Sequence, residues 1–85
     1  MTWTRREDME DQTVKRWLDN DKGDIISVVT GNTKGNTRLG IDGEIRCSIG
    51  NECFSIPCSL NVVAKKTDKE LIRVAERMYK RRKIK

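Results

Sequence analysis

Hydrophobic and polar residues alternate along residues 37–64, and two short polar dipeptides interrupt the alternation. The apolar positions are odd-numbered up to Ile49 and even-numbered from Phe54 onward. A period of two residues places each apolar set on one face of a β-strand. The dipeptides Asp42-Gly43 and Gly50-Asn51 are typical of two-residue hairpin loops, which need residues that tolerate positive φ. The segment therefore predicts an antiparallel meander of three strands, with one apolar and one polar face.

Residues 24–30 (DIISVVT) are rich in β-branched side chains and predict one more strand before the meander. Residues 31–36 (GNTKGN) are small and polar, which favours a connecting loop. Lys34 precedes the second glycine, whereas in a nucleotide-binding P-loop the lysine follows it. A P-loop is therefore excluded, and a looser contact between Lys34 and a phosphate is the remaining functional alternative to a plain connecting loop. Pro57 cannot donate a ladder hydrogen bond, so it implies an edge strand or a bulge, and the third run of the meander is expected to bend or break there.

Both ends of the chain carry helical patterns. Thr4 and Glu7 fit the capping-box motif, and a set of residues behind them shares one arc of a helical wheel: Met9, Thr13, Val14, Trp17 and Leu18. This first helix is expected to end near residue 20, before Gly23. Thr67 and Glu70 form a second capping box, and the apolar residues after it again share one arc: Leu71, Ile72, Val74, Ala75, Met78 and Tyr79.

The predicted element order is α-β-β-β-β-α, which is an α+β fold. Both helices are expected to cover the apolar face of a curved antiparallel sheet. A chain of 85 residues is the size of one domain with a small core. We place this single domain at residues 1–80, and we expect residues 81–85 to form a basic, frayed tail.

Several features favour an intracellular, cytoplasmic protein. The sequence has no long apolar run that could cross a membrane. Its first twelve residues are charged and lack the apolar stretch of a signal peptide. The three cysteines cannot all pair within the chain, whereas small secreted domains usually carry an even set of disulfides. Reduced thiols are therefore expected.

Charge is distributed unevenly along the chain. The net charge is −2 over residues 1–24, zero over residues 25–64 and +7 over residues 65–85, which together give the net charge of +5. The last segment holds ten basic side chains against Asp68, Glu70 and Glu76. The basic character thus belongs to the predicted second helix and its tail, and it is this asymmetry that needs an explanation.

Catalytic and metal-binding motifs are missing from the sequence. Histidine, the commonest general base and metal ligand, is absent. The cysteines have the spacing C-x₅-C-x₄-C, without the fourth ligand of a structural zinc site. Period two predicts that Cys47 and Cys58 point into the core and Cys53 points outward, as ordinary thiols. We therefore expect no enzymatic activity, no metal and no cofactor.

Lysine and arginine clustered on one helix face are the electrostatic footprint of a nucleic-acid-binding protein. The polar face of the predicted sheet has no aromatic platform for stacking bases, which favours a duplex over a single strand. The candidate contacts are in the last segment, with two sheet residues as an extension: Lys65, Lys66, Lys69, Arg73, Arg77, Lys80, Arg81 and Arg82, with Arg38 and Arg46.

The alternative is a regulatory or protein-interaction module whose basic helix serves solubility or meets an acidic protein. An unpaired edge strand is a ready pairing site, so such a module is expected to form a homo-oligomer or a partner complex that survives raised salt. Small, charge-rich chains without enzymatic motifs are common in phages and mobile elements, which is a suggestion about origin only. None of the motifs identifies a protein family.

Overall fold

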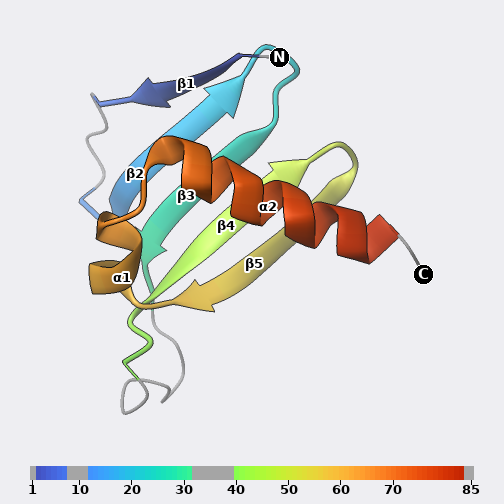
Figure 1. Cartoon of the computed structure of the whole chain (residues 1–85). Coiled ribbons are helices and arrows are strands. Elements are labelled where there is room, and N and C mark those ends of the chain that lie inside the picture. The colour runs from blue at the N-terminus through green and yellow to red at the C-terminus, as the bar shows by residue number, and fades with distance from the viewer. Residues whose placement is uncertain (1, 8–11, 32–39, 84–85) are drawn as a thin grey trace.

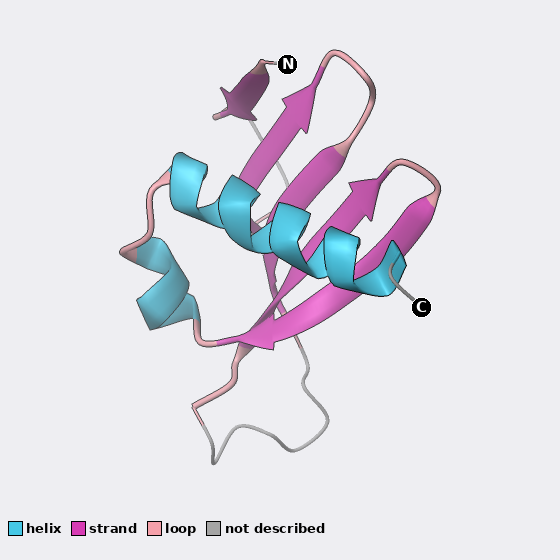
Figure 2. Ribbon diagram, turned by 45° about the vertical axis from the view of Figure 1, so that its right-hand side comes forward, coloured by secondary structure: helices cyan, strands magenta, loops and turns pink. Residues whose placement is uncertain are grey.

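The structure is a computed structural model of the chain, and it describes residues 2–7, 12–31 and 40–83 (Figure 1). The described residues form five strands and two helices: β1 (Trp3–Arg6), β2 (Val14–Asn20), β3 (Ile25–Thr30), β4 (Gly43–Ile49), β5 (Glu52–Cys58), α1 (Leu60–Ala64) and α2 (Asp68–Lys83). The strands form one antiparallel sheet in sequence order, from β1 to β5. Both helices lie on the same face of the sheet, and α2 crosses it diagonally (Figures 1 and 2). The fold is therefore α+β, as predicted, although its element order differs.

Three predicted elements are confirmed. The strand expected at residues 24–30 is β3. The Gly50-Asn51 dipeptide forms the hairpin between β4 and β5, with Gly50 at a φ of 58°. A main chain in this left-handed region strongly favours glycine or asparagine. Within the described part of the chain β5 pairs with β4 alone, so Pro57 lies in an edge strand, where its missing N–H is tolerated.

The predicted N-terminal helix is wrong, because its residues form β1 and β2. Arg5 pairs with Leu18 and Arg6 with Trp17, so the two strands run antiparallel. Trp17 and Leu18 are adjacent in sequence. In a helix they would share one apolar arc, whereas in a strand they point to opposite faces, and the sequence pattern allows both. Leu18 is 1% exposed on the helix-covered face, opposite Ile26 of β3. The pairing of β2 with β3 is what makes this segment a strand and not a helix.

The hairpin predicted at Asp42-Gly43 is also wrong. Gly43 is the first residue of β4 and pairs with both Thr30 and Cys58, inside the sheet. The expected strand at residues 37–41 falls largely outside the described residues, and Ile41 is not in a strand. Asp42-Gly43 is therefore not a hairpin loop. Because α1 lies directly over Gly43, a side chain there would collide with Leu60.

The third run of the meander breaks next to Pro57, as predicted. β5 stops at Cys58, one residue after Pro57, and the segment from Leu60 to Ala64 forms α1. The alternating pattern over residues 58–64 therefore does not mark strand. A helical turn fits the same residues because Val63 turns inward, at 4% exposed, while Val62 stays exposed.

The core lies between the sheet and the two helices. The odd-numbered apolar positions of the meander are buried as predicted, at Ile45, Cys47 and Ile49. Above them, Leu71 and Ala75 of α2 are fully buried. No helix among the described residues is both long enough and apolar enough to span a membrane.

Candidate nucleic-acid interface

The predicted C-terminal helix is confirmed as α2, together with its capping box. It continues to Lys83, so residues 81–83 are helical and do not belong to the predicted frayed tail, while residues 84 and 85 lie outside the described residues. The Thr67 backbone N–H donates to the Glu70 carboxylate at 2.8 Å, and the Glu70 backbone N–H donates to the Thr67 hydroxyl at 3.1 Å. These bonds satisfy two N–H groups that the first turn leaves unpaired. The bond from the Thr67 N–H, followed by the contact with its hydroxyl, lowers the pKa of Glu70. The cap thus fixes where the helix begins.

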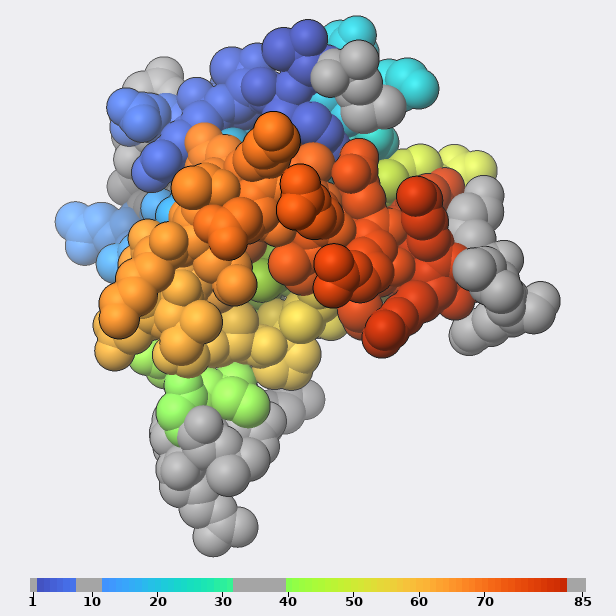
Figure 3. Space-filling view, in the orientation of Figure 1, coloured from blue at the N-terminus to red at the C-terminus, as the bar shows by residue number. Residues whose placement is uncertain are grey.

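Burial of Leu71 and Ala75 turns the opposite side of α2 toward solvent. Over its 16 residues the helix is about 24 Å long. Its exposed side carries five cations, which we call the α2 basic face: Lys69, Arg73, Arg77, Lys80 and Arg81. Glu70 and Glu76 are also exposed on this helix. The side of α2 seen in Figure 3, coloured orange to red, is the one away from the sheet.

The other predicted contact residues have varied positions. Lys65 is exposed and Lys66 is half-buried, both in the turn that joins α1 to α2. Arg82 lies in α2, with its guanidinium 5.3 Å from the centre of the Phe54 ring and its Nε 3.4 Å from the Glu52 carboxylate. Arg82 is therefore engaged with β5. The prediction for Arg38 falls outside the described residues.

Arg46 is not contiguous with the α2 basic face. It lies between Ile45 and Cys47, which face the helices, so its own side chain points to the open face of the sheet. There its guanidinium is 3.4 Å from the Glu44 carboxylate. Arg46 thus belongs to a different surface, with its charge compensated.

The open face of the sheet carries an aromatic residue that the sequence analysis had placed on a helix. The strand register aligns one row across all five strands: Arg6, Trp17, Ser27, Arg46 and Ser55. The indole N–H of Trp17 donates to the Asp19 carboxylate at 3.0 Å, and Arg6 donates to the same oxygen at 2.7 Å. The bond from Arg6 is the main reason that the pKa of Asp19 is lowered. The expectation that this face lacks an aromatic platform is therefore wrong, although its arginines are paired.

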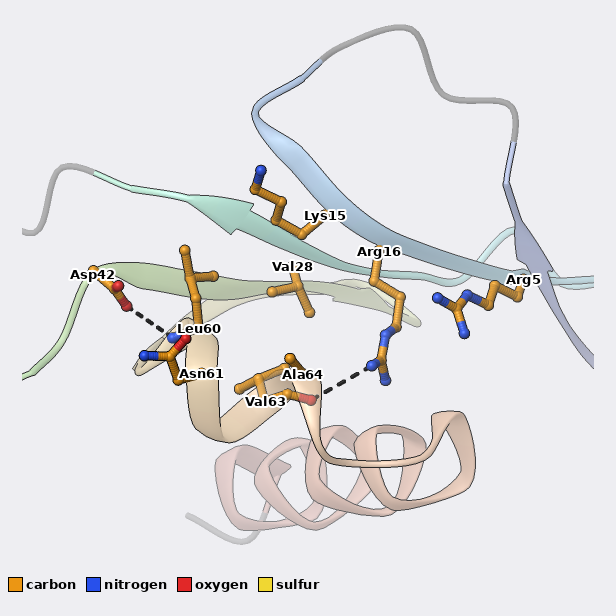
Figure 4. Close-up of a pocket in the computed structure, with 9 residues that line it drawn as sticks. All are labelled: Arg5, Lys15, Arg16, Val28, Asp42, Leu60, Asn61, Val63 and Ala64. Carbon is orange, nitrogen blue, oxygen red and sulfur yellow. Dashed lines mark hydrogen bonds between the residues drawn. The ribbon is translucent and has the colours of Figure 1, made fainter.

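A second cationic surface was not predicted. A cleft of about 470 Å³ opens between the β1–β2 end of the sheet and α1 (Figure 4). Arg5, Lys15 and Arg16 line it, and a neighbouring hollow of about 320 Å³ is lined by the same three side chains. We call the first of these the cationic cleft. The two basic pairs, Arg5-Arg6 and Lys15-Arg16, were visible in the sequence, but the helix assigned to them kept them apart.

Arg16 is the structural support of the cationic cleft. Its side chain is 10% exposed and faces the helices, because its residue is paired with Val28. The guanidinium donates to the carbonyl of Lys66 at 2.9 Å and to that of Val63 at 3.5 Å. It also lies 3.4 Å from the Asp68 carboxylate in the first turn of α2. One strand residue therefore holds the end of α1 and the start of α2.

The cysteines have the orientations that were predicted. Cys47 is buried, and burial raises its pKa to about 11. Cys58 is half-buried with a raised pKa, again mainly because of burial, and Cys53 is exposed. Among residues 2–7, 12–31 and 40–83, no three cysteine or carboxylate side chains gather as a metal site would require.

Comparison of the chain with protein-family models, with curated proteins and with solved structures found no match. Its function is therefore inferred from the chemistry of its surface.

Proposed function

We propose that the protein is a non-enzymatic module that binds nucleic-acid phosphates through the α2 basic face. The observation that carries this proposal is the five exposed cations on one side of a helix whose other side is fixed in the core. Lys65 and Lys66 extend the face at the N-terminal end of α2. Cations held on a rigid helix lose little conformational freedom of the backbone when they meet a row of phosphates.

A duplex is the favoured ligand. The exposed side of α2, over the part of the helix that the structure describes, carries no aromatic side chain, and Tyr79 packs against the core. Single-strand binding by stacking therefore has no platform on this face. Contacts from lysine and arginine to phosphates fix position on a duplex without selecting its sequence, so we expect binding with little sequence preference.

The number of cations sets the expected salt dependence. Each neutralised phosphate of a duplex contributes about −0.9 to the slope of log affinity against log salt. Five contacts give a slope of about −4.5, so affinity is expected to fall about 500-fold between 50 and 200 mM salt. A single strand bound by the same five side chains would give a slope of about −3.5.

The test is a fluorescence-anisotropy titration with labelled duplex DNA, duplex RNA and single strands at several salt concentrations. The variant Arg73→Glu/Arg77→Glu reverses two central charges of the α2 basic face. Lys22→Glu/Arg46→Glu is a matched control, because it changes the net charge equally on exposed side chains outside α2. Thermal unfolding checks that both variants fold.

The α2 variant is expected to lose duplex binding, while the control stays within a few-fold of the wild type and keeps its salt slope. Equal affinity of the wild type and the α2 variant would refute the proposal. Equal loss in both variants would also refute it, because binding would then follow net charge rather than the α2 basic face.

A second candidate function is self-association or protein binding through β5. Among residues 2–7, 12–31 and 40–83, this strand of seven residues has a neighbouring strand on one side only, which leaves its outer edge for pairing. Main-chain pairing depends little on salt. Sedimentation analysis at 0.5 M salt, about an order of magnitude above low-salt conditions, tests this alternative. An oligomer that persists there, in a protein that does not bind nucleic acid, would favour this second function.

A further inference from the structure

The cationic cleft has the size and composition of a small-molecule site. Its volume of about 470 Å³ is larger than an inorganic ion needs and lies within the range of ligand pockets. Val28 of β3 and Leu60 and Val63 of α1 supply apolar lining, and Asn61 supplies an amide. The cations lie on β1 and β2; in Figure 4 the guanidinium groups of Arg5 and Arg16 lie on the side of the sheet that faces α1, whereas the Lys15 ammonium points away from α1. The cleft is thus divided into an apolar part and a positively charged part.

Two of the three cations are available to a ligand. Arg5 lies 3.7 Å from the Asp68 carboxylate and 3.6 Å from the Glu7 carboxylate, and both distances exceed those of a hydrogen bond. Its side chain is 45% exposed. Lys15 is exposed and makes no ion pair with a carboxylate of the described residues. Neither group therefore has to break a strong bond before it binds an anion.

The register of β1, β2 and β3 explains where the side chains of Lys15 and Arg5 emerge from the sheet. The register between β2 and β3 shifts between Val14 and Arg16, so Lys15 is the extra residue of a bulge. Bulges redirect side chains and are frequent beside functional sites. Arg5 is aligned with Leu18 on the helix-covered face, and Figure 4 shows its guanidinium on the same side of the sheet as that of Arg16. Arg16 is already engaged, because its donors bind backbone carbonyls and the Asp68 carboxylate lies 3.4 Å away, so it shapes the cleft and adds little net charge to it.

We propose that the cationic cleft binds a phosphate monoester of nucleotide size. The phosphate lies against Arg5, and the exposed Lys15 side chain turns from the direction seen in Figure 4 to bind the same oxygens, while the nucleoside covers the apolar lining at Leu60. Asp42 accepts the backbone N–H of Leu60 at 2.8 Å through one oxygen, and its carboxylate also lines the cleft, where it can accept an amino group of a base. The site is separate from the α2 basic face, so the inference does not rest on duplex binding.

The phosphate monoester has two sources, a free nucleotide and the phosphorylated end of a strand. The test is a ¹⁵N-resolved NMR titration of the full chain with nucleoside 5′-monophosphates, the matching nucleosides and inorganic phosphate. Short single strands with and without a 5′-phosphate form the second arm. Amide shifts at Arg5, Lys15 and Asn61 report on the cleft, and shifts at Arg73 and Arg77 report separately on the α2 basic face.

Three variants make the test specific. Lys15→Glu is expected to weaken the monophosphate about tenfold, because it replaces a charge-assisted contact by repulsion. Glu7→Gln is expected to tighten binding about twofold or more, since the 77% exposed Glu7 competes for Arg5. Lys22→Glu is the matched control at the opposite end of β2, and its affinity is expected to equal that of the wild type.

The proposal is supported if a free monophosphate or a 5′-phosphorylated strand binds at the cleft and its affinity falls in the order Glu7→Gln, wild type, Lys15→Glu. The probe that binds then identifies the source of the phosphate. Equal binding by nucleosides would overturn the role of the phosphate. Equal binding by inorganic phosphate would overturn the role of the apolar lining. Absence of shifts at the cleft with every probe would overturn the site, whether or not α2 binds a duplex.

Discussion

Replacing Gly43 by alanine is expected to destabilise the protein, although it adds one methyl group at a position that resembled a turn. Gly43 is buried as the first residue of β4, beneath α1. A Cβ atom there would lie 2.5 Å from Leu60 Cδ2, 2.8 Å from Leu60 Cγ and 2.8 Å from the carbonyl oxygen of Val29. Real Cβ atoms do not approach other heavy atoms so closely, so α1 or the sheet must shift.

The magnitude follows from two opposing effects. Overpacking of a well-packed site costs about 1–3 kcal/mol. Replacing glycine by alanine also restricts the unfolded chain, which returns about 0.4–1 kcal/mol. The expected net loss is about 1–2 kcal/mol. With a urea dependence of about 1 kcal/mol per molar for a small domain, the midpoint of unfolding should fall by about 1–2 M.

Urea unfolding followed by tryptophan fluorescence measures this loss, and a double-mutant cycle with Leu60→Ala locates its cause. In the Leu60→Ala background the two side-chain contacts are absent, and the added methyl group meets only the Val29 carbonyl. Gly43→Ala should then cost clearly less than it does in the wild type. An unchanged or higher midpoint in the single variant would refute the close packing of α1 on β4. The same loss in both backgrounds would place the clash on the sheet and not on α1.

Two further predictions concern the α2 cap and the thiols. Thr67→Ala should lower the free energy of unfolding by about 1 kcal/mol in urea titrations, because it removes the N-cap hydroxyl. Because folding lowers the pKa of Glu70, its carboxylate stabilises the protein above the ordinary pKa of 4.5, and this stabilisation is lost as the pH falls through the lower folded value. Glu70→Gln should therefore flatten the decline of the thermal midpoint on the acid side. An unchanged pH profile of the midpoint would contradict this role of Glu70. With a colorimetric thiol reagent, Cys53 should react first and Cys47 only on unfolding, because burial raises the pKa of Cys47 to about 11. Rapid reaction in the variant Cys53→Ser/Cys58→Ser, where Cys47 is the remaining thiol, would contradict the burial of Cys47.

Local signals were sufficient for β3, the β4–β5 hairpin and α2. The Gly50-Asn51 turn needs a backbone conformation that few residues adopt, so the dipeptide is informative by itself. The Thr67–Glu70 capping box is followed by a continuous apolar arc, and both features agree on the same helix. The α2 basic face was predictable for the same reason, because its position follows from the side that is buried.

The N-terminal half of the fold could not be predicted in this way. The motif at Thr4 and Glu7 has the residues of a capping box, but Thr4 lies in β1 and pairs with Asp19. The spacing of Val14, Trp17 and Leu18 fits a helix as well as a strand. The strand is decided by the pairing of Leu18 with Ile26 of β3. Such a contact depends on residues outside the segment. The cationic cleft depends on the same pairing, so it could not be found before β1 and β2 were placed.

The cationic cleft and the α2 basic face depend on a common support, although they bind separately in our proposals. Arg16 donates to the carbonyls of Val63 and Lys66 on either side of the α1–α2 turn and lies beside Asp68 in the first turn of α2. A nearly buried guanidinium costs free energy unless such partners are present, so these contacts reinforce one another. The direction in which α2 leaves the turn is therefore fixed from the sheet. A strand residue that the sequence assigned to a helix thus helps to orient the helix that carries the proposed interface.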